Sequence, residues 1–117
     1  MHNDEYFMQI AMKMAYKAYE CNEVPIGAVI VMHDKQIIIE AHNQTIFLND
    51  PTAHAEILAI RQACALISNY RLVNSILYVT KEPCVMCAGA IIQARINKVI
   101  FATPDTKRGG AGAVSYT

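Results

Sequence analysis

Two short motifs that are far apart in this sequence act together only if the fold brings them to one place. The first is His54-Ala55-Glu56, and the second is Pro83-Cys84-Val85-Met86-Cys87. One imidazole and two thiols are ligands that zinc prefers, and three protein ligands leave a fourth position for water, as in catalytic zinc sites. The sequence therefore predicts a catalytic Zn²⁺ site with His54, Cys84 and Cys87 as ligands and Glu56 as the residue that moves protons.

The spacing of these residues favours two helix amino termini that point at one metal ion. Cys84 and Cys87 lie on one face of a helix, and the positive end of the helix dipole favours the thiolate form of both. His54 and Glu56 do not have a same-face spacing, so they converge only if the metal lies beyond the end of their helix. Two thiolates cancel the charge of Zn²⁺ and leave the bound water less acidic, which makes a carboxylate at Glu56 more useful.

Other interpretations of the two motifs stay open. The C-x-x-C pair alone fits a redox-active dithiol, although such a pair leaves His54 and Glu56 without a role. A histidine and an acid near each other in a helix are often a packed or capping histidine beside a surface acid. A structural zinc site requires a fourth protein ligand, for which Cys64, Cys21 and His42 are available. Cys21 and Cys64 otherwise fit apolar helical patterns as small buried side chains.

Length and composition indicate one cytoplasmic domain over residues 1–117. The chain is 54% hydrophobic and 17% charged, which is typical of a folded protein with one modest core. It contains no apolar run of the ~18 residues that cross a bilayer, and Asp4 and Glu5 stand where a secretory signal carries positive charge. In the cytosol, a C-x-x-C favours metal or redox chemistry over a structural disulfide.

The charge balance argues against a nucleic-acid-binding surface that covers the whole molecule. The chain has ten basic and ten acidic residues and a net charge of zero. Any contact with RNA therefore depends on a local cluster, for which Lys98, Lys107 and Arg108 are candidates.

Hydrophobic periodicity predicts an alternation of helices and strands. The apolar positions predict helices over residues 4–21, 51–66 and 83–95, and strands over 26–32, 36–41, 76–80 and 98–102. The first two strands are expected to form a hairpin, and the later strand–helix units predict a mixed sheet covered by helices.

The residues around the two motifs are informative as well as the candidate ligands themselves. They read Asp50-Pro-Thr-Ala-His-Ala-Glu56, Tyr78-Val-Thr-Lys-Glu-Pro-Cys84 and Cys87-Ala-Gly-Ala-Ile91. H-x-E…P-C-x-x-C is the known signature of zinc-dependent nucleobase deaminases. Over nearly the whole chain, the sequence resembles the bacterial tRNA-specific adenosine deaminases. This resemblance implies an α/β fold of the three-layer, cytidine deaminase-like α/β/α type, and conversion of the wobble adenosine of a tRNA anticodon loop to inosine.

The same resemblance implies further site residues and a partner. Asn43 stands where the family has an asparagine that hydrogen-bonds the flipped base, and the backbone amide of Ala55 is implied in holding that base. Ile26 and Val29 are expected to line the pocket, and Asp105 to contact the nucleotide backbone. Members of the family are homodimers, which makes a homodimer the expected assembly.

One departure and two alternatives follow from the comparison with that family. Its members usually carry a further carboxy-terminal helix, so we expect that region of the family to be missing here and tRNA binding to be weaker. A free-base or nucleoside deaminase that acts on guanine, cytosine or cytidine uses the same zinc residues and is the alternative enzyme. A non-catalytic partner subunit is the other alternative, but such chains typically lack the glutamate that is present here as Glu56.

Overall fold

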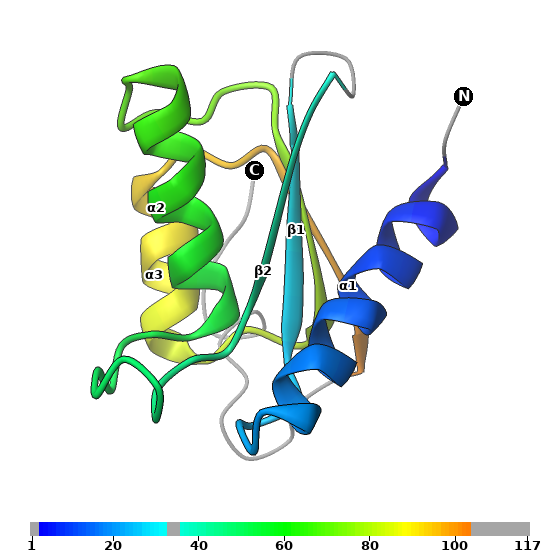
Figure 1. Cartoon of the computed structure of the whole chain (residues 1–117). Helices are drawn as coiled ribbons and strands as arrows, with labels where there is room; N and C mark the ends of the chain where they lie inside the picture. Colours follow the sequence, from blue (N-terminus) through cyan, green and yellow to red (C-terminus); the bar gives the residue numbers. More distant parts are fainter. Residues whose placement is uncertain (1–2, 33–35, 104–117) are drawn as a thin grey trace.

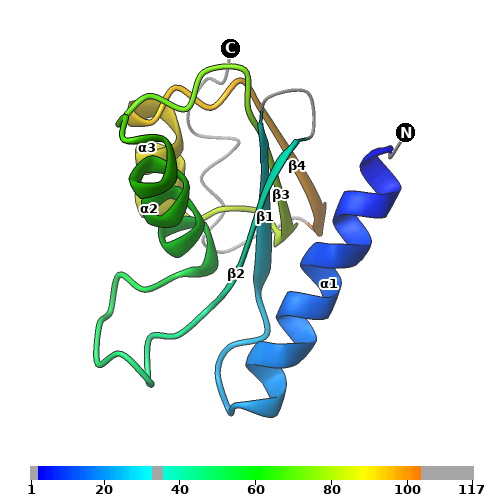
Figure 2. The ribbon, with the colours of Figure 1, turned by 45° about the horizontal axis from the view of Figure 1, so that its top comes forward.

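The computed structural model describes residues 3–32 and 36–103 as one sheet between two layers of helices. In chain order the elements are α1 (Asp4–Glu20), β1 (Gly27–Met32), β2 (Ile37–His42), α2 (Ala55–Ile67), β3 (Ile76–Lys81), α3 (Val85–Gln93) and β4 (Lys98–Thr103). Helix α1 covers one face of the sheet, and α2 and α3 lie side by side on the other (Figure 1; Figure 2). The α/β/α layers predicted from the sequence are confirmed.

The sheet is mixed, as predicted, with the strand order β2-β1-β3-β4. Strand β1 pairs antiparallel with both β2 and β3, and β3 pairs parallel with β4. The parallel pair requires a crossover connection, and α3 provides it between β3 and β4. The predicted hairpin is present as the β1–β2 pair, although His33 and the rest of its turn lie outside the described residues.

The central strand β1 is buried along its whole length because helices cover both of its faces. Its alternate side chains divide between two hydrophobic clusters. Ala28, Ile30 and Met32 belong to the cluster shared with α2, whereas Val29 and Val31 pack with Phe7 of α1. The edge strand β2 alternates between exposed and half-buried positions over most of its length.

Helix α1 is fixed to the sheet near its first turn by polar and aromatic contacts. The Asn3 side chain caps the helix by accepting a hydrogen bond from the Tyr6 amide at 3.0 Å. The Tyr78 hydroxyl of β3 donates to Asp4 Oδ1 at 2.6 Å. The rings of Phe7 and Tyr78 lie 5.3 Å apart between centroids. These contacts set the position of α1 relative to β3.

Two helices begin later than their sequence patterns predict. Helix α2 begins at Ala55 rather than Pro51, because Asp50 forms a turn in which its Oδ1 accepts hydrogen bonds from the amide and the hydroxyl of Thr52. Helix α3 begins at Val85 rather than Pro83, and it ends at Gln93. The shift places His54 and Cys84 at the N-cap positions of the two helices.

No helix in the described part of the chain is both long enough and apolar enough to span a bilayer.

The approach of β1 to α1 allows no side chain at Gly27. A Cβ atom at this position would overlap the carbonyl oxygen of Ala11 and lie 2.5 Å from the backbone nitrogen of Ala15. We expect Gly27→Ala to lower the free energy of unfolding by about 3 kcal/mol, because the helix must move off the strand. Denaturant unfolding of the zinc-loaded protein measures this change.

Gly89→Ala in α3 is the matched control. A Cβ atom there meets nothing within 4 Å, so the helix gains about 0.5–1 kcal/mol from the better helix former. Equal stabilities for the two variants would contradict the packing of α1 described here.

Candidate active site

The two predicted motifs meet where α2 and α3 begin. His54 has extended backbone torsions as the N-cap of α2, and its side chain makes no capping hydrogen bond. Cys84 has the same role at the start of α3, with Cys87 one turn further along that helix. The predicted convergence of two helix amino termini is therefore present, with His54 and Cys84 as N-cap residues rather than residues of the first turn.

The three candidate ligands are close enough to bind one ion. The Nδ1 atom of His54 lies 3.7 Å from Cys84 Sγ and 3.4 Å from Cys87 Sγ. All three donor atoms lie within 4.8 Å of one another. Cys87 is fully buried, and His54 and Cys84 are half-buried, so the cluster opens towards one side.

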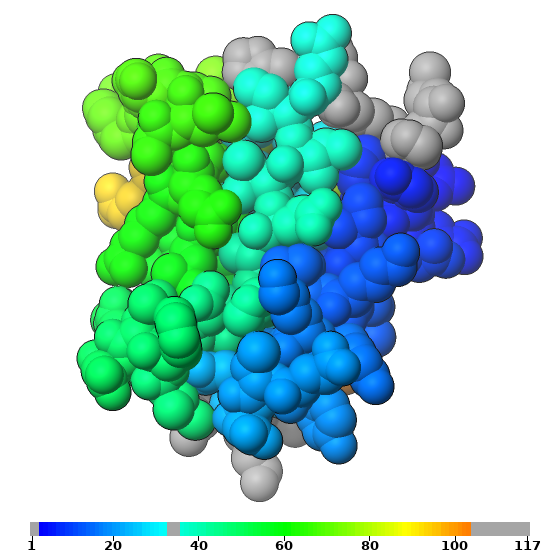
Figure 3. All heavy atoms as spheres, in the orientation of Figure 1, coloured from blue at the N-terminus to red at the C-terminus, as the bar shows by residue number. Residues whose placement is uncertain are grey.

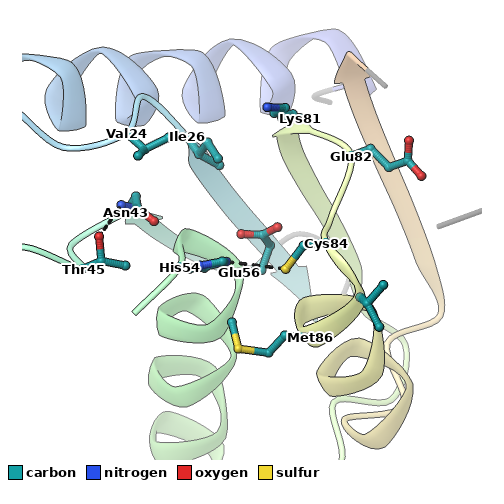
Figure 4. Close-up of a pocket in the computed structure, with 11 residues that line it drawn as sticks. Val24, Ile26, Asn43, Thr45, His54, Glu56, Lys81, Glu82, Cys84 and Met86 are labelled. Carbon is teal, nitrogen blue, oxygen red and sulfur yellow. Dashed lines mark hydrogen bonds between the residues drawn. The ribbon is translucent and has the colours of Figure 1, made fainter. Parts of the chain in front are cut away.

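Glu56 lies beside these donors in a buried position. Its side chain is 3% exposed, and its Oε1 atom has no hydrogen-bond partner within the part of the chain that the structure describes. Burial raises the pKa of this carboxyl above its ordinary value. In Figure 4 the carboxyl group lies close to His54 and Cys84. A buried oxygen without a partner is costly to keep unless a ligand or a proton transfer uses it.

The Cys87 thiol is buried beside two other groups that carry negative charge when they are ionised. Burial raises its pKa, and the nearby Glu56 and Cys84 raise it further. A metal ion bound by this thiol would offset both effects, because a thiol that coordinates a metal is deprotonated.

The donor set fits zinc. One imidazole nitrogen and two sulfurs are the ligand types of Zn²⁺ sites, and three protein ligands are typical of the catalytic kind. Among the described residues, His54, Cys84 and Cys87 form the one group of this size, so neither Cys64, Cys21 nor His42 provides a fourth ligand. The arrangement therefore fits a catalytic site and argues against the structural zinc alternative.

A cavity of about 500 Å³ leads to the cluster. Of the predicted base-binding residues, Asn43 and Ile26 line it, together with the catalytic candidates His54, Glu56 and Cys84. The Asn43 side chain is 3% exposed and donates from Nδ2 to Thr45 Oγ1 at 3.3 Å (Figure 4). Its amide edge is thus held at the cavity wall.

The other residues predicted for substrate binding differ in their placement. Ala55 is the first residue of α2 and its side chain is buried in the core, so only its backbone is available for the predicted contact. Val29 does not line the cavity, because it points to the opposite face of the sheet and packs with Phe7. Asp105, and with it Lys107 and Arg108, lies outside the described residues, whereas Lys98 is exposed on β4.

The cavity also contains residues that the sequence analysis did not single out as substrate contacts. They are Val24, Thr45, Lys81, Glu82, Val85 and Met86. Val85 and Met86 are the two residues between Cys84 and Cys87, so the sequence alone could have predicted that they lie beside the metal site. Val24 and Thr45 carry no such signal, since only the pairing of β1 with β2 brings their segments together.

Comparison with known proteins agrees with this geometry. Residues 1–103 match the family described as the cytidine and deoxycytidylate deaminase zinc-binding region. The chain therefore belongs to this family of zinc-binding deaminases.

Within that family, the chain is similar to tRNA-specific adenosine deaminases. It is 50% identical over 110 residues to that of Haemophilus influenzae, covering 94% of this chain and 64% of the relative. It is 49% identical over 110 residues to that of Aquifex aeolicus, covering 94% of this chain and 72% of the relative. The chain thus spans about two thirds of the length of these curated relatives.

Two solved structures have nearly the same fold. One comes from studies of A-to-I editing by tRNA:A34 deaminases, with a TM-score of 0.87 and 48% identity over 90% of this chain and 75% of that one. The other is guanine deaminase from Bacillus subtilis, with a TM-score of 0.86 and 42% identity over 96% of this chain and 69% of that one. The cytidine deaminase-like fold predicted from the sequence is confirmed.

Removal of one thiolate ligand should remove the metal. We expect Cys87→Ala to bind zinc far more weakly than the parent, because only two protein ligands remain. Cys64→Ser is the matched control, since this half-buried cysteine lies outside the donor group and should leave one zinc per chain. Metal analysis after dialysis measures both, and loss of zinc in the Cys64 variant would instead indicate a fourth protein ligand.

Proposed function

We propose that this chain is a zinc-dependent deaminase that converts the wobble adenosine of a tRNA anticodon loop to inosine. The observation that carries the proposal is the buried Glu56 carboxyl, whose Oε1 lacks a partner among the described residues and lies beside three zinc-type donors at the end of a cavity. The similarity to tRNA-specific adenosine deaminases over 94% of the chain supports the choice of substrate.

The proposed reaction is hydrolytic and consumes one water molecule per base. When bound by His54, Cys84 and Cys87, zinc would lower the pKa of a water molecule and so make it a nucleophile at neutral pH. Glu56 would accept a proton from the attacking water and deliver protons to the ring nitrogen and to the leaving amine. The amine-bearing ring carbon becomes a carbonyl carbon, and ammonia leaves. The raised pKa of Glu56 suits a group that must both accept and give a proton.

The cavity wall opposite the metal ligands provides the proposed contacts to the base. Asn43 presents a carboxamide, which donates and accepts hydrogen bonds as the polar edge of a purine requires. Ile26 provides an apolar surface for the flat ring. The amide of Ala55 lies at the positive end of α2 and completes the proposed set. Asp105 stays a proposed contact to the nucleotide backbone.

The proposal includes a partner and a location. A homodimer is proposed because the tRNA-specific deaminases that the sequence resembles are dimeric, and exposed apolar residues at the cavity rim support it. Val85 is 63% exposed and Met86 is 38% exposed at the start of α3. A cytoplasmic location is proposed because tRNA is the substrate.

A free-base deaminase is the second candidate. The observation that favours it is the fold similarity to Bacillus subtilis guanine deaminase at 42% identity. Both enzymes require the same metal ligands and proton shuttle, so only the substrate separates them.

Incubation of the zinc-loaded chain with three substrates in parallel tests the choice. The substrates are an anticodon stem-loop with a wobble adenosine, guanine and cytidine, and mass spectrometry detects replacement of the amine by oxygen. We expect inosine in the stem-loop and no change in the other two. Conversion of guanine or cytidine without the stem-loop would contradict the tRNA assignment.

Loss of the Glu56 carboxylate should stop the chemistry without loss of the metal. We expect Glu56→Ala to lower kcat by about 10²–10⁴-fold, because general acid–base assistance is lost. Single-turnover kinetics and metal analysis measure the two effects. Glu40→Gln on the exposed edge of β2 is the control and should leave both unchanged. Substantial activity in the Glu56 variant would show that another group moves the protons.

A further inference from the structure

A second buried carboxylate lies outside the zinc cluster and holds a loop. Glu23, between α1 and β1, is 6% exposed. One of its oxygens accepts a hydrogen bond from the Ile46 amide at 3.1 Å, and the other accepts one from the Phe47 amide at 2.8 Å. Both acceptors of this side chain are therefore used by two consecutive backbone donors of one loop. Charge-assisted bonds of this kind are stronger than neutral ones.

The two amides are ones that the loop cannot pair by itself. Residues 45–49 form a turn in which the Leu48 amide donates to the Gln44 carbonyl at 3.0 Å. The amides that precede Leu48 have no carbonyl acceptor within the turn, as is the case for the first amides of any helix. Ile46 and Phe47 are in that position, and Glu23 accepts from both. A residue from a distant part of the sequence thus caps this turn.

Hydrophobic packing does little to hold the same loop. Three successive side chains are exposed, with Ile46 at 66%, Phe47 at 76% and Leu48 at 45%. A second cavity of about 340 Å³ lies against the loop and is lined by Glu23, Ile46 and Phe47 among others. In Figure 3 the blue-green atoms of the loop form a projecting lobe beside the light-blue atoms of the segment after α1. The position of the loop therefore depends on polar contacts.

The two hydrogen bonds from the Ile46 and Phe47 amides to Glu23 are called the Glu23 clamp here, or the clamp for short. The clamp joins two segments that form one wall of the active-site cavity. The segment that carries Glu23 also contributes Val24 and Ile26 to that wall, and the loop begins with Asn43 and Thr45 on the same wall. The two segments are also joined by the Asn43 amide, which donates to the Ile26 carbonyl at 3.0 Å. The clamp lies only one residue beyond Thr45, whose hydroxyl accepts from the Asn43 side chain.

We infer that Glu23 is a positioning residue, which fixes the loop after β2 and thereby the orientation of Asn43 towards the base of the substrate. Glu23 itself is not among the residues that line the active-site cavity, nor is it part of the His54, Cys84 and Cys87 donor group. Its effect is on the binding of the base, whereas the zinc ligands and Glu56 are held by α2 and α3. This inference rests on the proposed function for the contact between Asn43 and the base.

The test compares Glu23→Gln and Glu23→Ala with a matched control. A Gln side chain keeps the size of Glu, but its NH₂ group must face one of two backbone donors, so one bond is lost. Glu20→Gln makes the same change at an exposed position at the end of α1, which lines neither of the two cavities. All proteins are the full zinc-loaded chain. Amide hydrogen exchange at Ile46 and Phe47, zinc content, and kcat and KM for the anticodon stem-loop are measured.

We expect exchange at both amides to become faster in Glu23→Gln and faster still in Glu23→Ala, with the amides of α2 and the zinc content unchanged. KM should rise by about tenfold in Glu23→Gln, the loss expected for one hydrogen bond to a charged group. Its kcat should stay within about twofold of the parent value, as when an interaction that binds substrate and transition state equally is removed.

Three results would overturn the inference. They are unchanged exchange at the two amides, a fall in kcat with KM unchanged, and an equal change in KM in the Glu20 control. If the parent chain does not deaminate the stem-loop, the proposed substrate is wrong, and the clamp is still decided by the exchange rates. KM is then measured with whichever of guanine and cytidine the parent converts.

Discussion

The site is built on the burial of the Glu56 carboxyl and the Cys87 thiol beside the half-buried thiol of Cys84, at the point where two helices begin. Burial raises the pKa of both Glu56 and Cys87, and the neighbouring Glu56 and Cys84 raise the pKa of Cys87 further. A metal ion bound here would offset the negative charge of the ionised groups, so metal binding and ionisation of the Cys87 thiol are coupled. The fold contributes by placing His54 and Cys84 at two N-caps that face one another.

The sequence was sufficient for the chemistry of the site because its residue types are restrictive. A histidine, two cysteines and an acid with these spacings leave few alternatives, and the three ligands meet as predicted. A mixed sheet covered by helices also followed from periodicity, since β1 and β3 are apolar runs of the kind found in covered sheets, whereas the three-layer arrangement followed from the family resemblance. The exact starts of α2 and α3 did not follow, because the Asp50 turn competes locally with the helix.

The wall of the cavity was harder to predict because it depends on which strands pair. Val29 was expected there and lies on the other face, since alternate residues of β1 point in opposite directions and Ile26 lies just before the strand. Glu23 gave no signal in the sequence, because its partners are backbone amides that any residue type supplies. Contacts between a side chain and a distant backbone group cannot be predicted from the spacing of residues in the sequence. They can be identified only once the fold is known.

The helices on the two faces of the sheet are under different constraints, because only one face carries the active-site cavity. Among the described residues, helix α1 contributes none to the wall of the active-site cavity, although its buried residues complete the core on the far face of β1 and β3. The sequence of α1 is thus constrained by its packing and by the hydrogen bond from Tyr78 to Asp4, whereas α2 and α3 must also keep a fixed direction at their first residues. The two faces of one sheet are free to evolve at different rates, and divergence between related chains should concentrate on the α1 side.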